Sequence, residues 1–281
     1  MGRDEFRRRP VRPKRSLGQH FLVNTAIVEK MLSLADLKAD PVLEVGPGRG
    51  ILTRRLVQKA SRVLAVEKDD ILCEELAAAF KGQINLELIH SDILDLDLDE
   101  HLVDGMKIIA NLPYNIATQF IIRILEQASR LSAVVVMVQS EVALRICASP
   151  GDPAYSAMSV LVSSAFVTHA GFVVMPANFF PRPKVDSRVI KLIPRTDPVT
   201  RSEVKAFKAV VFTAFGQRRK ILRNSLIRLP GLNHDHLSLL AHDAGIDLGV
   251  RPQELSQETY RRFARLYQER IVCAGPNSGS R

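Results

Sequence analysis

Four consecutive residues, Asn111-Leu112-Pro113-Tyr114, directly follow a short apolar run and combine two hydrogen-bond acceptors with an aromatic ring. The Asn111 side-chain oxygen and the Leu112 carbonyl can accept both hydrogens of a primary amine, and Pro113 stiffens the turn without adding a donor. An adenine amine is a poor nucleophile because its lone pair is delocalised, so acceptors that favour a pyramidal nitrogen would activate it. Since Tyr114 can stack on the base, the tetrapeptide predicts methyl transfer to such an amine. A proline turn with a packed tyrosine is the alternative.

A glycine-rich turn lies earlier in the chain, between an apolar run and a helical pattern. The run 42–45 leads into glycines at positions 46, 48 and 50, which let a ligand approach the backbone closely. Glu67 ends the next apolar run 21 residues after Gly46, a suitable distance for a carboxylate that accepts the hydroxyls of a ribose. These features predict a bound adenosine moiety, and a simple tight turn is the alternative.

Two observations favour S-adenosylmethionine over a dinucleotide as the ligand of this turn. A dinucleotide fingerprint would place its third glycine at position 51, where this chain has Ile51. The third apolar run ends just before Asp92, whose carboxylate would stand at the neighbouring strand tip and accept a hydrogen bond from the cofactor's adenine amine. A turn or helix cap in an acidic loop is the alternative role for Asp92. The chemistry requires no metal.

Short apolar runs alternate with helical patterns through the first half of the chain. Strands are expected at 42–45, 63–66, 86–89, 107–110 and 133–138, and helices at 51–60, 71–80 and 117–127. Asn24 can cap a helix ahead of the first of these strands. This alternation predicts an α/β fold with a mostly parallel, Rossmann-like sheet covered on both faces.

The pattern changes after Gly151. We expect a helix at 154–165, two strands at 167–174 and 187–193 that resemble a terminal antiparallel pair, and helices at 204–215, 220–226, 235–244 and 257–270. The domain prediction is a basic flexible arm (1–15), a Rossmann-like domain (16–196), a small all-helical C-terminal domain (197–274) and a disordered tail (275–281).

The charge of the chain is unevenly distributed. Its 39 Lys and Arg residues against 30 Asp and Glu give a net charge of +9, and residues 1–15 alone hold seven basic side chains. A second run, 216–228, holds five basic side chains and no acidic one. Solvated surface is the alternative for either run, but together, beside a nucleotide-binding fold, they favour contact with nucleic acid.

Other features exclude several classes of protein. No apolar run approaches the roughly 20 residues of a membrane helix, and the basic start is not followed by the apolar stretch of a secretory signal. Cys73, Cys147 and Cys273 show neither metal-ligand spacing nor a disulfide framework. We expect a cytoplasmic protein with reduced thiols and no membrane segment.

Further motifs carry a resemblance to a known family. Residues 17–22 (LGQHFL) and 179–187 (FFPRPKVDS), with the tetrapeptide 111–114, make the chain from 14 to about 267 similar to the ribosomal RNA adenine dimethyltransferases. Residues 212–224 look like the small-subunit branch. The resemblance implies the sheet of a class I S-adenosylmethionine-dependent methyltransferase and a small helical C-terminal domain.

The resemblance also implies a role for particular residues. S-adenosylmethionine would contact His20, Leu22, Gly46, Glu67, Asp92 and Asn111. The catalytic set would be Asn111, Leu112, Pro113, Tyr114 and Phe179. RNA would contact Lys184, Arg218, Arg219, Lys220 and Arg223. Tyr114 and Phe179 would sandwich a flipped adenine, and we expect one of Phe179 and Phe180 to pack in the core instead.

The activity implied by the resemblance is dimethylation of two adjacent adenines in the 3′-terminal hairpin of 16S ribosomal RNA, within a nearly assembled small subunit. The resemblance suggests that the enzyme is a monomer. The alternatives are a non-catalytic small-subunit assembly factor, a large-subunit ribosomal RNA adenine dimethyltransferase and, more distantly, a nicotinamide oxidoreductase.

Overall fold

The computed structural model describes residues 13–14 and 17–273. Most of the predicted arm (1–15) and all of the predicted tail (275–281) lie outside these residues. The chain divides into two compact units. The first comprises the described residues up to Phe120, with Arg130–Ser140 and Ala170–Lys191, and the second comprises Ile121–Ser129, Glu141–His169 and the described residues from Leu192 onward. The domain boundary expected at 196/197 stays a prediction.

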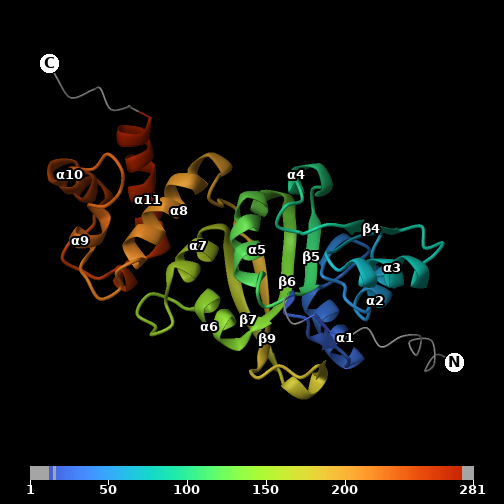
Figure 1. Cartoon of the computed structure of the whole chain (residues 1–281). Helices are drawn as coiled ribbons and strands as arrows, with labels where there is room; N and C mark the ends of the chain where they lie inside the picture. The colour runs from blue at the N-terminus through green and yellow to red at the C-terminus, as the bar shows by residue number, and fades with distance from the viewer. Residues whose placement is uncertain (1–12, 15–16, 274–281) are drawn as a thin grey trace. The chain divides into compact units, whose positions relative to one another are not determined.

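A seven-stranded sheet has the order β4-β3-β2-β5-β6-β9-β7 (Figure 1). The strands are β2 (Pro41–Val45), β3 (Arg62–Glu67), β4 (Leu86–His90), β5 (Met106–Asn111), β6 (Leu131–Gln139), β7 (Phe166–Val174) and β9 (Ser187–Pro194). The pairs β2–β3, β2–β5, β3–β4 and β5–β6 are parallel, which confirms the predicted parallel sheet. β9 and β7 are neighbours, as expected for the last two strands.

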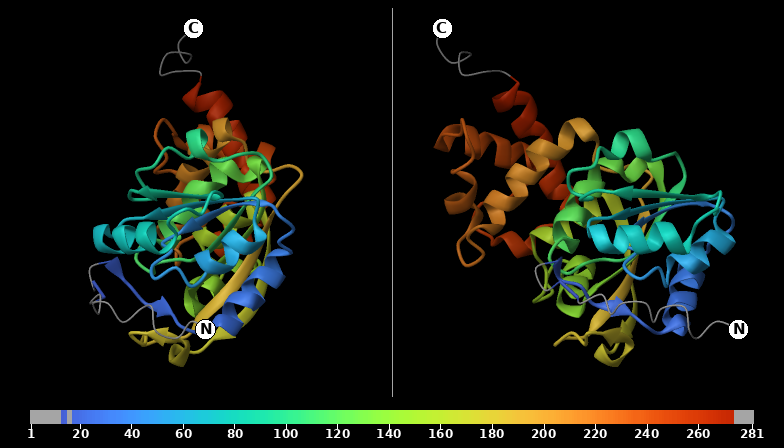
Figure 2. Two further views of the ribbon diagram at one scale, coloured as in Figure 1. Left: turned by 90° about the vertical axis from the view of Figure 1, so that its right-hand side faces the viewer. Right: turned by 45° about the vertical axis from the view of Figure 1, so that its right-hand side comes forward.

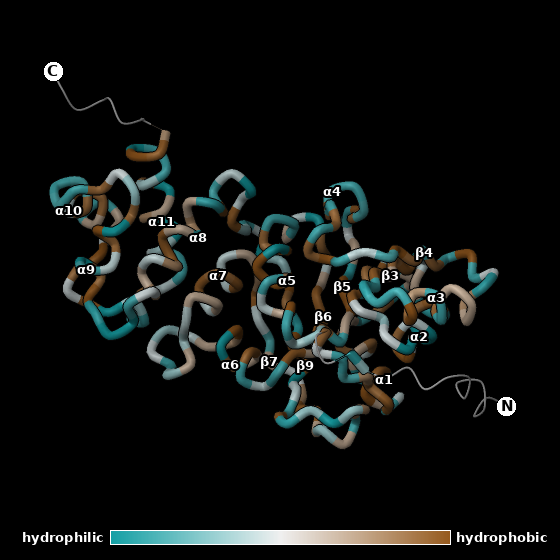
Figure 3. The backbone as a smooth tube through the Cα atoms, in the orientation of Figure 1, coloured by the Kyte–Doolittle hydropathy of each residue, from teal (hydrophilic) through white to brown (hydrophobic). Residues whose placement is uncertain are grey.

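Burial explains why the central strands read as continuous apolar runs. Nearly every residue of β2, β3, β5 and β6 is buried, because helices cover both faces of a parallel sheet. The edge strand β4 is only partly buried. Figure 2 shows helices on both sides of the strands, and in Figure 3 the hydrophobic colour follows β5 and β6.

The helices of the first half begin close to the predicted residues. They are α1 (Thr25–Ala35), α2 (Thr53–Lys59), α3 (Asp70–Ala79) and α5 (Ala117–Arg123), whereas the short helix α4 (Leu98–His101) was not predicted. The Asn24 side chain accepts a hydrogen bond from the Ala26 N–H and caps α1, as predicted. The expected helix 117–127 is corrected in its second half, where α5 ends at Arg123 and a 3₁₀ segment, η3 (Ile124–Arg130), follows. Helix α6 (Ser140–Cys147) was not predicted.

The second unit holds the remaining predicted helices. They are α7 (Ala157–Ala165), α8 (Arg201–Phe215), α9 (Leu222–Leu226), α10 (His234–Ala244) and α11 (Gln257–Tyr267). The helix expected at 257–270 is α-helical only to Tyr267 and continues as the π-helix η6 (Gln268–Val272). Within the part of the chain that the structure describes, no helix is both long and apolar enough to cross a bilayer.

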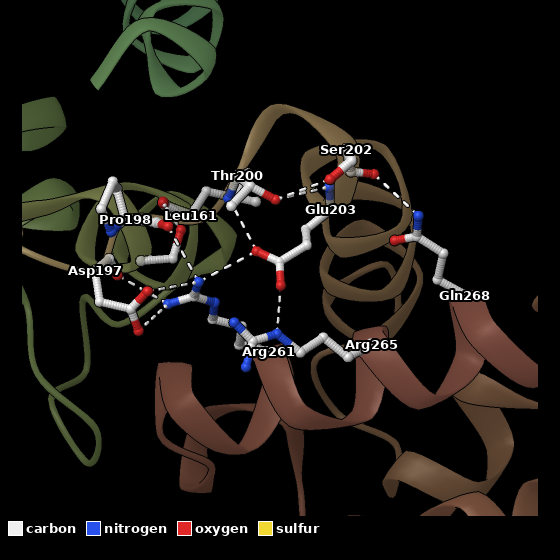
Figure 4. Close-up of polar contacts among 10 residues, drawn as sticks. Leu161, Asp197, Pro198, Thr200, Ser202, Glu203, Arg261, Arg265 and Gln268 are labelled. Carbon is white, nitrogen blue, oxygen red and sulfur yellow. Dashed lines mark hydrogen bonds and ion pairs between the residues drawn. The ribbon is translucent and has the colours of Figure 1, made fainter. Parts of the chain in front are cut away.

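A buried arginine joins α11 to the start of α8 (Figure 4). Arg261 donates to the Asp197 carbonyl at 2.8 Å and to its carboxylate at 3.0 Å, and also to the Glu203 carboxylate at 3.2 Å. Glu203 accepts from the Thr200 N–H at 2.9 Å and pairs with Arg265. Burial raises the pKa of Glu203, but the Thr200 N–H and the two guanidinium groups outweigh it and lower that pKa to about 2. The Glu203 carboxylate therefore stays ionised at ordinary pH.

Candidate active site

A pocket lies at the carboxyl ends of the parallel strands, where ligands bind in open α/β sheets. The turn after β2, the end of β3, the loop after β4, residues 111–116 after β5 and residues 17–22 line it. The lining includes every residue expected to contact the cofactor: His20, Leu22, Gly46, Glu67, Asp92 and Asn111. The structure therefore brings together residues that are spread over 92 positions of the chain, from His20 to Asn111.

The glycine turn after β2 depends on two of its glycines. Gly46 and Gly48 have φ of +64° and +57°, a region that side chains with a Cβ rarely adopt. A Cβ on Gly46 would lie 3.3 Å from the Pro113 ring, and one on Gly48 would lie 3.0 Å from the Phe21 ring. These two glycines thus let the turn approach Pro113 and Phe21 more closely than residues with a Cβ could.

Glu67 presents a carboxylate that is held in place by backbone donors. Its Oε2 accepts from the Gly48 N–H at 3.0 Å, and its Oε1 accepts from the Lys68 and Asp69 N–H groups at 2.9 Å each. Burial is the largest influence on its pKa and raises it, while the three N–H donors act in the opposite direction. Oε1 already accepts two hydrogen bonds, whereas Oε2 keeps lone-pair capacity for a further donor, such as a hydroxyl group.

Asp92 has both a structural and a ligand-facing position. Its Oδ1 accepts from the Leu94 N–H at 2.9 Å, which is the turn cap considered as the alternative, and its Oδ2 accepts from the Lys68 ammonium at 2.6 Å. It also lines the pocket. A role in binding the adenine of a cofactor therefore stays a prediction.

The side chain of Asn111 is held by a hydrogen bond to His20, which belongs to the pocket-lining residues 17–22. Its Nδ2 donates to the His20 carbonyl at 3.2 Å. This bond is made by the amide nitrogen, so the amide oxygen Oδ1 is not used in it. The Leu112 N–H donates to the Met137 carbonyl at 3.2 Å, whereas the Leu112 carbonyl accepts no hydrogen bond from the described residues. Two acceptors of adjacent residues therefore remain available at the end of β5. The Pro113 carbonyl accepts from two N–H groups at 3.1 Å at the start of α5.

The Tyr114 side chain is held through its hydroxyl group and through its ring. Its hydroxyl lies 2.6 Å from the Ser187 hydroxyl, and its ring centroid lies 5.4 Å from that of His20 with a 32° tilt. Burial raises the pKa of Tyr114, so the phenol stays neutral. A fixed ring at the pocket wall is suited to stacking on a planar group.

The two neighbouring phenylalanines of strand β8 (Phe179–Phe180) have different surroundings. β8 pairs antiparallel with β1 (Phe21–Leu22), with Leu22 opposite Phe179. Phe179 is 3% exposed and packs in the core cluster that includes Leu22, whereas Phe180 is 56% exposed. Phe179 is not among the residues that line the pocket, so its stacking role stays a prediction that requires its ring to become accessible.

The predicted RNA contacts are surface residues. Lys184 is exposed in the loop before β9, Arg219 and Lys220 are exposed between α8 and α9, and Arg223 is exposed on α9. Arg218 instead donates to the carbonyls of Pro153 and Tyr155 at 3.1 and 2.8 Å, which fixes its guanidinium on its own unit. No cluster of three or more His, Cys, Asp or Glu side chains able to hold a metal occurs within residues 13–14 and 17–273.

Sequence reasoning missed one acidic residue of the pocket, Glu44. It is 1% exposed on β2, and its Oε2 has no hydrogen-bond partner among the described residues. Burial, with a smaller effect of the Glu67 charge, raises the pKa of Glu44 to about 8. An acid inside an otherwise apolar strand run was the available signal.

Replacing Glu44 with Gln should remove a loss of stability at high pH. An acid whose pKa is raised by folding stabilises the fold fully below its unfolded pKa, about 4.3, and this contribution is lost as the pH rises towards about 8. The melting temperature of Glu44→Gln minus that of the wild type should therefore increase as the pH rises from roughly 5.5 to 8.5. Thermal unfolding across this range measures the difference.

Glu29→Gln is the control, because the Lys59 ammonium lowers the pKa of Glu29 and its contribution changes only at acid pH. A melting-temperature difference for Glu44→Gln that is constant across the range would contradict the assignment.

Comparison with known proteins gives concordant matches. The model of a family described as "Ribosomal RNA adenine dimethylase" matches residues 11–269. Proteins named "Ribosomal RNA small subunit methyltransferase A" from Dehalococcoides mccartyi and Syntrophotalea carbinolica are each 40% identical over 264 residues, covering 92% and 93% of this chain and 89% and 99% of those proteins.

Two solved structures share the fold over most of the chain. A dimethyladenosine transferase from Plasmodium falciparum has a TM-score of 0.72 at 24% identity, covering 89% of this chain and 98% of that one. The 23S rRNA methyltransferase ErmE has a TM-score of 0.64 at 25% identity, covering 88% and 98%. The predicted α/β methyltransferase fold is confirmed.

Proposed function

The chain belongs to the ribosomal RNA adenine dimethylase family, and we propose that it transfers methyl groups from S-adenosylmethionine to the N6 amines of adenines in small-subunit ribosomal RNA. The observation that carries this proposal is the pair of available acceptors, Asn111 Oδ1 and the Leu112 carbonyl, in the same pocket as Glu67. The proposed targets are the two adjacent adenines of the 3′-terminal hairpin of 16S ribosomal RNA, each dimethylated.

The choice of the small subunit is supported by the names of the relatives. The two relatives described above are each 40% identical and carry a small-subunit name, whereas the structure of the 23S rRNA enzyme is 25% identical. A monomeric state and a cytoplasmic location stay predictions.

The residues of the pocket fit S-adenosylmethionine. Gly46 and Gly48 line the pocket without side chains and would let the cofactor approach the backbone of the turn closely, and the Glu67 carboxylate would accept its ribose hydroxyls. Asp92 would accept from its adenine amine, with His20 and Leu22 as further contacts. When bound, the cofactor supplies a methyl group on a positively charged sulfur, and this charge suits a pocket lined by carboxylates.

The chain itself activates the acceptor amine by position and by hydrogen bonding. Asn111 Oδ1 and the Leu112 carbonyl would accept the two amine hydrogens, so that the nitrogen lone pair points away from them towards the methyl group. These oxygens also stabilise the positive charge that develops on nitrogen as the new bond forms. Tyr114 would hold one face of the base, and the released proton can leave to solvent. Positioning is the larger part of the catalysis.

Asn111→Ala should lower methyl transfer by at least about a hundredfold, the usual effect of removing one catalytic hydrogen-bonding group, while RNA binding is retained. Nucleoside mass spectrometry of unmethylated small subunits incubated with protein and cofactor measures transfer, and filter binding measures RNA affinity. Leu112→Met is the matched control, because it keeps the volume of a buried side chain and the backbone carbonyl. Wild-type turnover by Asn111→Ala would refute the assigned role.

Phe179→Leu should lower transfer about tenfold if this ring stacks on the target adenine, since stacking contributes roughly 1–3 kcal/mol per base. The family resemblance and the pairing of Phe179 with Leu22, a pocket residue, support this role. Phe180→Leu, a change at the exposed neighbour, should leave transfer near the wild-type rate. The reverse pattern in the same mass spectrometry assay would assign stacking to Phe180.

Replacing Arg219, Lys220 and Arg223 together with Ala should weaken RNA binding and reduce the salt slope of log affinity by roughly two to three. The three side chains are exposed and have no ion-pair partner among the described residues. Arg270→Ala serves as the control, because Arg270 pairs with Asp243 at 2.5 Å. RNA titrations at several salt concentrations measure the slope, and a slope equal to that of the control would exclude these contacts.

A further inference from the structure

Residues 17–22, here called the strap, line the pocket and contact both the glycine turn and Asn111. The Phe21 ring lies 5.1 Å from the Arg49 guanidinium on the glycine turn. The His20 carbonyl accepts from Asn111 Nδ2 at 3.2 Å, and the His20 ring bonds through Nδ1 to the Pro181 carbonyl at 2.8 Å. The position of the strap therefore sets the orientation of the Asn111 amide.

One buried carboxylate outside the pocket lining holds the start of this strap. The Asp69 side chain is 0% exposed, and its Oδ2 accepts from Gln19 Nε2 at 2.8 Å. Its Oδ1 accepts from the Lys14 ammonium at 3.0 Å and from the Ile71 N–H at 3.1 Å. Gln19 is fixed in turn, because its Oε1 accepts from the Lys14 N–H at 2.7 Å.

The backbone of Asp69 reaches the cofactor side of the pocket. Its N–H donates to Glu67 Oε1 at 2.9 Å, so a single residue contacts both the strap and the carboxylate placed for the ribose. Breaking a hydrogen bond to a buried charged group costs more than breaking a neutral one, because the charge is left without compensation. The bonds from Gln19 and Lys14 are therefore strong constraints on the strap.

We propose that Asp69 is a positioning residue that keeps the strap over the pocket and so controls how long the cofactor stays bound and how Asn111 is oriented. Asp69 does not line the pocket. It acts through Gln19 and the adjacent His20, whose carbonyl fixes the Asn111 amide. This inference rests on the proposed function for the identity of the cofactor.

The test uses a substitution that separates this role from helix capping. Asp69 is also the N-cap of α3. Asp69→Asn keeps a cap oxygen for the Ile71 N–H but removes the charge and one of the two acceptor oxygens. Asp97→Asn is the matched control, because Asp97 caps α4 through the Asp99 N–H at 2.9 Å and lies outside the pocket lining.

The first readout is the release of labelled S-adenosylhomocysteine from the full-length protein, chased with unlabelled ligand. Asp69→Asn should release it about tenfold faster, in line with the loss of charge-assisted hydrogen bonds, and Asp97→Asn should match the wild type. The second readout is amide hydrogen exchange of residues 17–22 without ligand, which should be faster in Asp69→Asn alone. In methyl transfer, KM for the cofactor should rise and kcat should fall.

Wild-type release and exchange in Asp69→Asn would overturn the proposal. If that variant does not fold, Lys14→Met carries the test, since the Lys14 side chain is 38% exposed and should show the same two changes to a smaller extent. Failure of the proposed function gives a different result, because the wild type itself would then bind no S-adenosylhomocysteine. If the wild type binds the ligand and transfers methyl groups, but Asp69→Asn and Asp97→Asn show the same release and exchange, only the role of Asp69 is refuted.

Discussion

The reversal of strand order at β2 is the constraint on which the site depends. β3 and β5 lie on opposite sides of β2, so the loops after β2 and β5 diverge at the carboxyl edge of the sheet and leave a crevice there. The glycine turn follows β2, and Asn111 ends β5. Because these loops start from buried, hydrogen-bonded strands, the Asn111 and Leu112 acceptors and the Glu67 carboxylate that line the pocket are held by rigid backbone.

Much of this arrangement could be predicted from local patterns. Central parallel strands are buried on both faces and therefore appear as continuous apolar runs, and a polar residue that follows such a run, like Glu67 or Asn111, lies at the site edge. The cap at Asn24 and the glycine turn have equally local signals. Residue types at strand ends were enough to predict which of these residues line the pocket at the carboxyl edge of the sheet.

The missing parts depend on contacts between distant residues. The pairing of β1 with β8 joins positions about 160 residues apart, and within this pair Phe179 is buried while Phe180 is exposed. The role of Asp69 was not predicted, because its bonds to Lys14 and Gln19 join distant positions and produce no periodic pattern in the sequence. Similarly, a helical pattern does not distinguish the α-helix ending at Tyr267 from the π-helix that follows it.

The buried guanidinium of Arg261, between α11 and the start of α8, limits which substitutions this part of the chain can accept. Arg261 makes hydrogen bonds to Asp197, Pro198 and Glu203, and of the two carboxylates only that of Glu203 is mostly buried. Losing Glu203 would leave the buried guanidinium with only an exposed carboxylate as its counter-charge and would destabilise the fold. Exchange of the whole cluster for apolar residues of similar volume carries no such penalty. Divergence at these positions should therefore be concerted, with arginine and its carboxylates kept or replaced as a set.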